Sequence, residues 1–153
     1  MKRRYSAEVT YATSVSDLVQ RFPKYQEEIR GYMDDDEPLP FIALGCVIIP
    51  HLEEALREAD LKVILSFCAY FEDIAVSSAS DSDLENLLGI EVGEWLGFME
   101  NEDRLSPWLG PETKRLCRYV PGLATQRREH KANAAASSFL RRIGVRLGLV
   151  QAK

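Results

Sequence analysis

Apolar residues recur at intervals of three and four positions along most of this chain, which is the spacing of one face of an α-helix. The clearest stretches are Leu39–Ala59, Leu61–Val76 and the segment from Leu84 to Met99. Short polar segments separate them, so the pattern predicts an all-α domain of consecutive short helices, stacked as HEAT-like hairpins or packed as an irregular bundle. Only Tyr5–Tyr11 alternates apolar and polar residues, which predicts a short N-terminal strand or an extended arm.

Short polar residues mark where helices should begin, because their side chains can accept hydrogen bonds from the free amides of a first helical turn. The residues in such positions are Ser14, Asp60, Ser82 with Glu85 at capping-box spacing, and Ser106 followed by Pro107. Gly110-Pro111 predicts the start of a further helix that ends before Pro121.

Proline and glycine interrupt two of the long helical patterns. Pro50 lies inside Leu39–Ala59 and removes one backbone hydrogen bond, so it should bend this helix, or else a new helix begins there. Gly89, Gly93 and Gly97 recur every four residues in a later helical pattern. Each glycine costs about 1 kcal/mol in a helix interior. The three glycines therefore indicate either a close helix crossing or a break near Gly89, and we favour the break.

The cysteines and the apolar runs indicate the compartment. Cys46, Cys68 and Cys117 each fall in an apolar helical pattern, which predicts reduced core thiols and a cytoplasmic location. The core positions expected within Leu61–Val76 are Ile64, Leu65, Cys68, Phe71 and Ala75. No apolar run approaches the roughly 18 residues of a membrane span, and no apolar stretch follows the basic N-terminus, so neither a span nor a signal peptide is expected.

Charge is strongly segregated along the chain. Residues 31–113 contain nineteen acidic and three basic residues, a net charge of −16, whereas residues 114–153 contain ten basic residues and one acid, a net charge of +9. The overall net charge of −5 conceals this contrast. A concentrated field of one sign attracts a partner of the other sign and speeds encounter, although many charge runs are only solvated faces.

The charge pattern divides the chain into two parts. Residues 1–120 are expected to form an acidic helical domain, and residues 121–153 a basic linker followed by a C-terminal helix. The apolar side of that helix consists of Phe139, Leu140, Ile143 and Leu147. We expect it to pack on the acidic domain of its own chain, since burying apolar area is favourable by about 25 cal/mol per Å².

Signals for catalysis or metal binding are weak. His51 lies within an apolar helical pattern and is interpreted as a hydrogen-bonded structural histidine, and His130 lies in the basic linker. No ligand pair has zinc or iron spacing, and no glycine-rich phosphate loop is present. Glu72-Asp73, or Glu91 with Glu94, would in principle form a carboxylate pair or a divalent-ion site, but such groups are usually surface residues. No enzymatic activity, metal or cofactor is therefore expected.

Three stretches of the sequence resemble a family of small, all-helical bacterial proteins, some of which are encoded beside polymorphic toxins and are regarded as immunity proteins. The stretches are Asp83-Leu84-Glu85-Asn86-Leu87-Leu88 continuing to Trp95-Leu96, Trp108-Leu109-Gly110-Pro111-Glu112-Thr113-Lys114-Arg115-Leu116, and Leu39-Pro40-Phe41. The resemblance covers roughly Ser14 to Val120. The Leu-Gly-Pro-x-Thr turn is its most specific mark, and the basic segment after Pro121 departs from it.

The resemblance implies an immunity protein that binds and neutralises a secreted bacterial toxin, and the charge pattern predicts a basic toxin domain as its partner. The carboxylates expected at the interface, chosen for charge and expected exposure, are Asp34, Asp35, Asp36, Asp73, Asp81, Asp83, Glu91 and Glu94. The alternatives are a helical scaffold or adaptor, or a nucleic-acid-binding regulator that uses the basic arm. Nucleic acid is not expected as a partner, because the acidic body would repel phosphates.

Overall fold

The computed structural model describes residues 8–32 and 39–117, and every regular element in these ranges is helical. The α-helices are α1 (Ser14–Arg21), α2 (Gln26–Arg30), α3 (Pro40–Ile42), α4 (Ile49–Glu58), α5 (Leu61–Ser77), α6 (Ser82–Leu88), α7 (Met99–Leu105) and α8 (Pro111–Leu116). The short 3₁₀ turns are η1 (Tyr11–Thr13), η2 (Pro23–Tyr25) and η4 (Ser78–Ser80), and the π-helical segments are η3 (Ala43–Ile48) and η5 (Gly89–Glu94). The all-α prediction is confirmed.

The expected N-terminal strand and the basic C-terminal helix fall largely outside the described ranges. Residues 8–10 have no regular structure and Tyr11 begins η1, so the described part of Tyr5–Tyr11 forms no strand. Residues 121–153, on which we predicted the linker and the docked helix, lie outside the described residues.

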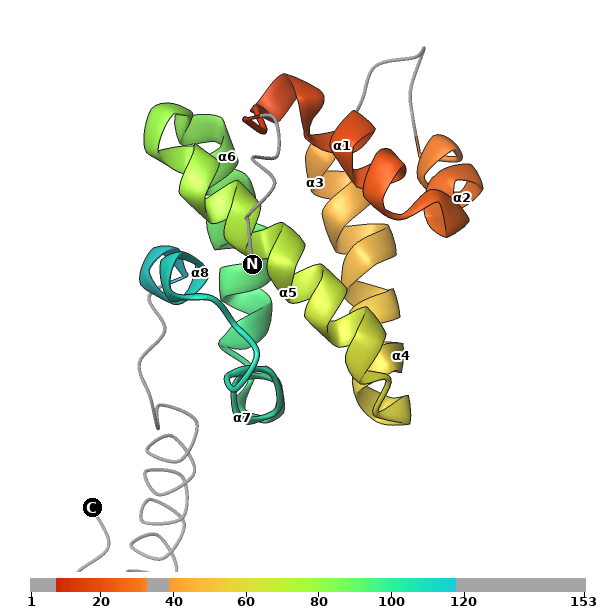
Figure 1. Cartoon of the computed structure of the whole chain (residues 1–153), viewed down its shortest axis with the longest axis vertical. Helices are drawn as coiled ribbons and strands as arrows, with labels where there is room; N and C mark the ends of the chain where they lie inside the picture. Colours follow the sequence, from red (N-terminus) through yellow and green to blue (C-terminus); the bar gives the residue numbers. More distant parts are fainter. Residues whose placement is uncertain (1–7, 33–38, 118–153) are drawn as a thin grey trace, which may run out of the picture.

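The centre of the fold is α5, which crosses the front of the molecule in Figure 1 and contacts α4, α6 and α8. The Asp60 carboxylate accepts hydrogen bonds from the Lys62 and Val63 amides at 3.1 Å, so Asp60 caps this helix as predicted. The buried residues of α5 are Ile64, Phe67, Cys68, Tyr70, Phe71, Ile74 and Ala75. Leu65 was expected in the core, but it points away from this face and is 47% exposed.

The N-terminal helices cover one side of α5 through aromatic contacts. Phe22 packs against Phe67, with ring centroids 4.8 Å apart, and against Tyr70 at 5.8 Å in an edge-on arrangement. The buried Tyr70 hydroxyl donates a hydrogen bond to the Ser14 carbonyl at 3.1 Å. Burial raises the pKa of Tyr70, so this hydroxyl remains a donor near neutral pH.

Two helical rods continue through π-helical segments where the sequence suggested interruptions. The first runs through α3, η3 and α4, with Pro50 in the first turn of α4. The π-helical segment ends at Ile48, and α4 begins at Ile49. Pro50, which has no backbone amide donor, lies directly after this change of helix type, and the rod continues through it. In the second rod α6 runs into η5 at Gly89, so the break predicted at Gly89 is wrong.

The end of α8 lies against two glycines of the second rod, but at distances that do not require glycine, so the other interpretation of their spacing, a close helix crossing, is not confirmed. A Cβ placed on Gly93 would lie 3.5 Å from the Cα and the Cβ of Cys117, at the end of α8. A Cβ on Gly89 would lie 3.9 Å from the Leu116 side chain. Both distances are ordinary van der Waals contacts, so the end of α8 lies directly against η5.

Three predicted helix starts differ in the structure: a neighbouring residue takes the cap position at two of them, and no helix begins at the third. Thr10 and Thr13 form a capping box on η1, and the Ser14 hydroxyl instead donates to the Tyr11 carbonyl at 2.7 Å. Asp81, not Ser82, caps α6, because its extended backbone directs the carboxylate to the amides of the first turn. Ser106 is the C-cap of α7, so no helix begins at Pro107.

Leu61–Ser80 is long and apolar enough to cross a membrane when judged by length and composition alone. The central helix of a globular protein meets the same criterion, and Phe67, Phe71 and Ile74 of α5 are fully buried.

Glu102 of α7 is an exception to the apolar core. Its side chain is 3% exposed, and neither carboxylate oxygen has a hydrogen-bond partner in the part of the chain that the structure describes. Burying an unpaired charge is costly.

We therefore expect Glu102→Gln to raise the free energy of unfolding by about 1 kcal/mol or more in urea titrations at pH 7. Glu58→Gln, at an exposed site, should change it by less than about 0.5 kcal/mol. A destabilised Glu102→Gln variant would contradict the view that this carboxylate lacks a partner.

Candidate functional site

Two of the acidic residues predicted at the interface have structural partners instead of a free surface. The Asp73 carboxylate forms an ion pair with Arg21 at 2.5 Å, which ties α5 to α1. The Asp81 carboxylate accepts hydrogen bonds from the amides of Asp83 and Leu84 and from the Tyr11 amide at 2.8 Å. These backbone donors hold the pKa of Asp81 below its ordinary value. Asp34, Asp35 and Asp36 lie outside the described residues.

The other three predicted interface residues, Asp83, Glu91 and Glu94, lie on the single rod formed by α6 and η5. Asp83 and Glu94 are exposed, and Glu91 is half-buried. None of their carboxylates forms a hydrogen bond or an ion pair with the described part of the chain. We call these three residues the acidic face.

Glu91 lies where the two π-helical segments meet. η3 contacts η5, and the Glu91 carboxylate occupies the space beside Gly45 that any larger residue would fill with its Cβ. Burial and the nearby Glu94 carboxylate raise the pKa of Glu91. π-helical turns are rare and frequently occur at functional sites. A cation from a partner would offset the repulsion between the Glu91 and Glu94 carboxylates at this junction.

The shifted pKa of Glu91 has a measurable consequence for stability. The folded state holds the Glu91 proton more tightly than the unfolded state does, so ionised Glu91 destabilises the fold once the pH exceeds both pKa values. Glu91→Gln should therefore raise the urea unfolding midpoint at pH 7. The gain should disappear below pH 4.5, the ordinary pKa of glutamate, where both states are protonated. An equal gain at both pH values would show that charge is not the cause.

Apolar side chains accompany the acidic face. Ile90, adjacent to Glu91 in the chain, is 45% exposed, and Ile42, directly before η3, is 37% exposed. On the same rod, Trp95 is buried and its indole nitrogen donates to the Glu53 carboxylate of α4 at 2.6 Å. The residues near the η3–η5 junction thus include unpaired carboxylates and exposed aliphatic side chains. The Trp95–Glu53 hydrogen bond joins the second rod to α4. Protein interfaces commonly combine apolar and polar groups in this way.

The Leu-Gly-Pro-x-Thr turn has a structural explanation. At the start of α8, the Glu72 carboxylate of α5 accepts hydrogen bonds from the Glu112 amide at 3.1 Å, the Thr113 amide at 2.9 Å and the Thr113 hydroxyl at 2.9 Å. Gly110 leaves room for this carboxylate, since a Cβ there would overlap it. Pro111 occupies a first-turn position that needs no amide donor. The turn therefore anchors α8 to α5.

The remaining residues considered for chemistry have structural surroundings. His51 stacks on Tyr25 with ring centroids 4.1 Å apart and lies 2.7 Å from a Glu28 carboxylate oxygen, so the prediction of a hydrogen-bonded histidine is confirmed. Cys68 and Cys117 are shielded, and burial raises the pKa of both thiols to about 12. Cys46, expected in the core, is exposed. Within the described residues no group of three or more potential ligands is placed to hold a metal ion.

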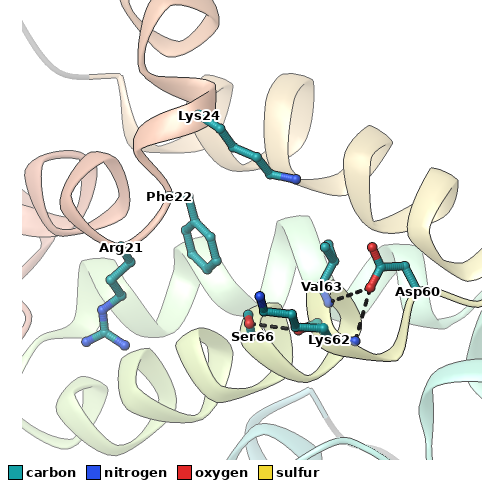
Figure 2. Close-up of a pocket in the computed structure, with 7 residues that line it drawn as sticks. All are labelled: Arg21, Phe22, Lys24, Asp60, Lys62, Val63 and Ser66. Atoms are coloured by element: carbon teal, nitrogen blue, oxygen red, sulfur yellow. Dashed lines mark hydrogen bonds between the residues drawn. The ribbon is translucent and has the colours of Figure 1, made fainter.

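A cleft with a volume of about 520 Å³ lies between η2 and the first turns of α5, and we call it the η2–α5 cleft (Figure 2). The residues that line it are Arg21, Phe22, Lys24, Asp60, Lys62, Val63 and Ser66. Figure 2 shows Lys24 reaching in from η2, Lys62 and Ser66 on the opposite wall, and Phe22 between them. Sequence reasoning missed this cleft, because nothing in the spacing of Lys24 and Lys62 shows that they meet in space.

Comparison with known proteins identifies a family but no activity. The sequence profile of a family described as a domain of unknown function (DUF7674) matches residues 15–124. That range includes every described helix from α1 to α8 apart from the first residue of α1. No curated protein and no solved structure matches the chain.

Proposed function

The chain belongs to the DUF7674 family, a domain family of unknown function. From the charge and exposure of its surface residues, we propose that this protein is a non-enzymatic immunity protein that neutralises a secreted bacterial toxin. The proposed partner is a toxin domain with a basic surface, and the proposed contact is the acidic face together with Asp34, Asp35 and Asp36, which lie outside the described residues.

The charge balance of the folded body supports a basic partner. The described residues contain nineteen acidic and eight basic side chains, a net charge of −11. Several of the few cations are already neutralised: Arg21 pairs with Asp17 and Asp73, Arg30 with Glu27, and Arg115 with Glu112. These pairs neutralise carboxylates together with the cations and leave the net charge at −11, and a field of this sign attracts a basic partner and speeds association.

The observation that carries the proposal is the absence of internal partners for Asp83, Glu91 and Glu94 among the described residues. The other acidic residues just described serve the fold as helix caps or ion pairs. Carboxylates held on one rod without a cation, beside the exposed Ile90, form a ready surface for lysine and arginine side chains.

The toxin assignment depends on two further arguments. The sequence resembles a family in which some members are regarded as immunity proteins. In addition, toxins that act on nucleic acids or nucleotides need basic clefts to hold phosphates, and an acidic inhibitor complements such a cleft. Rapid capture matters for an inhibitor of this kind, because the toxin must be bound before it acts.

Co-expression tests the proposal. The full chain is produced with the C-terminal domain of a large secreted protein encoded beside it, and growth and co-elution are measured. We expect the chain to rescue growth and to co-elute with the toxin domain. Cells that die, with no complex formed, would contradict the immunity role. A stable complex with a housekeeping protein instead would support the scaffold alternative.

A further inference from the structure

The η2–α5 cleft differs in charge from the body around it. In a folded body with a net charge of −11, its lining carries three cations and one carboxylate. We propose that this cleft binds a small organic anion, a phosphate or carboxylate group on a compact apolar or aromatic body. Lys24 and Lys62 would supply the charged contacts and Phe22 the apolar wall. This binding is separate from the toxin-neutralising function proposed above.

Lys24 and Lys62 are the charges available to a ligand. Neither ammonium group forms an ion pair with another described residue. The Lys24 ammonium lies 4.5 Å from the centroid of the Tyr25 ring, a cation–π contact that favours its position on the cleft wall. Figure 2 shows the two lysine side chains on opposite walls, so an anionic group between them would meet both.

The other charged residues of the cleft are engaged in the fold. Arg21 forms ion pairs with Asp17 at 2.7 Å and Asp73 at 2.5 Å. Asp60 accepts hydrogen bonds from two amides of the first turn of α5 through one of its carboxylate oxygens. The positive end of this seventeen-residue helix, equivalent to about half a unit charge, partly balances the Asp60 carboxylate, and the two lysines outweigh the remainder.

The apolar wall is rigid and the space is of ligand size. The Phe22 ring is fixed by Phe67 and Tyr70, and half-buried Val63 also lines the cleft. The volume of about 520 Å³ lies within the range of about 300–1,000 Å³ typical of small-molecule sites. A compact ring with one anionic group matches this combination. A nucleic acid does not, because the surrounding acidic body would repel its backbone.

The proposal can be tested by NMR titration of the ¹⁵N-labelled full chain. The probes are phenyl phosphate, benzoate, inorganic phosphate and benzylamine. We expect saturable shifts of the Phe22, Lys62 and Val63 amides with phenyl phosphate or benzoate, and the tighter of the two identifies the anionic group. Inorganic phosphate, which lacks the ring, should bind at least about fivefold more weakly. Benzylamine, with the opposite charge, should produce no saturable shift at these amides.

Matched variants distinguish specific binding in the cleft from nonspecific electrostatic attraction of anions to the protein. Lys24→Met with Lys62→Met retains the apolar stems and should weaken binding of the better anion about tenfold or more. Arg57→Met, at an exposed position of α4 that does not line the cleft, should bind it as the wild type does. The spectra also report whether each variant is folded.

The proposal is overturned if neither ring-bearing anion gives saturable shifts up to about 10 mM, if benzylamine binds equally well, or if the double variant binds like the wild type. None of these outcomes bears on toxin binding.

Discussion

Replacing Gly110 with alanine should lower the free energy of unfolding by about 3 kcal/mol. The added Cβ would overlap the Glu72 carboxylate, which accepts three hydrogen bonds from the first turn of α8. Glu72 would have to move, and the amides of Glu112 and Thr113 would lose their acceptor beside a buried Thr113 side chain. Urea unfolding followed by circular dichroism at pH 7 measures the effect.

Gly93→Ala is the matched control for this prediction. A Cβ at Gly93 meets Cys117 only at ordinary contact distance, so alanine fits there. Alanine also favours the helical state over glycine by up to about 1 kcal/mol. We therefore expect Gly93→Ala to be neutral or slightly stabilising. Equal effects of the two substitutions would show that general glycine flexibility, and not the space needed by Glu72, determines the result at Gly110.

The second large effect concerns association with the basic partner. Glu94→Lys should slow association about tenfold at low ionic strength and flatten its salt dependence, because it places a positive charge within the acidic face. Glu94 is exposed and has no partner among the described residues, so the fold should be retained. Stopped-flow association with the toxin domain at two salt concentrations gives the rates.

Glu58→Lys distinguishes a local contact from overall charge. It changes the net charge by the same amount, at an exposed residue at the end of α4, away from α6 and η5. We expect it to slow association much less than Glu94→Lys does. If the two variants slow association equally, only the overall charge matters and the acidic face is not the contact.

Local chemistry explains why much of the fold could be predicted from the sequence. Asp60 caps α5 as expected, because an aspartate directly before a helix can accept hydrogen bonds from the free amides of the first turn. Gly110-Pro111 marks the start of α8, because proline fits the first turn of a helix, where no amide donor is needed, and disrupts a helix interior. His51 was predicted to be hydrogen-bonded, because an imidazole in an apolar helix needs a partner.

The errors arose where two local signals competed or where tertiary packing decided. Asp81 and Ser82 are both good caps, and the choice of Asp81 depends also on the Tyr11 amide, a residue far away in sequence. Gly89 begins a π-helical segment instead of a break, and this segment lies against the end of α8, a neighbour that local sequence does not reveal. Leu65 fits the helical spacing of a core residue, yet the buried face of α5 is centred on Phe67, Phe71 and Ile74.

The candidate site was only partly visible in the sequence. Charge and expected exposure selected Asp73 and Asp81 together with Asp83, Glu91 and Glu94, and these criteria do not reveal which carboxylates serve the fold. That distinction needs the positions of Arg21 and the Tyr11 amide, which come from other elements. The space that Glu91 occupies beside Gly45 likewise depends on the meeting of η3 and η5.

Hydrogen–deuterium exchange of the full chain, with and without the toxin domain, tests the central claim most directly. The claim is that the acidic face on α6 and η5 binds a basic protein partner. It predicts that the amides of residues 82–96 gain protection in the complex, whereas those of the η2–α5 cleft do not. Protection confined to other helices, or unchanged exchange at residues 82–96 in a complex shown to form, would contradict it.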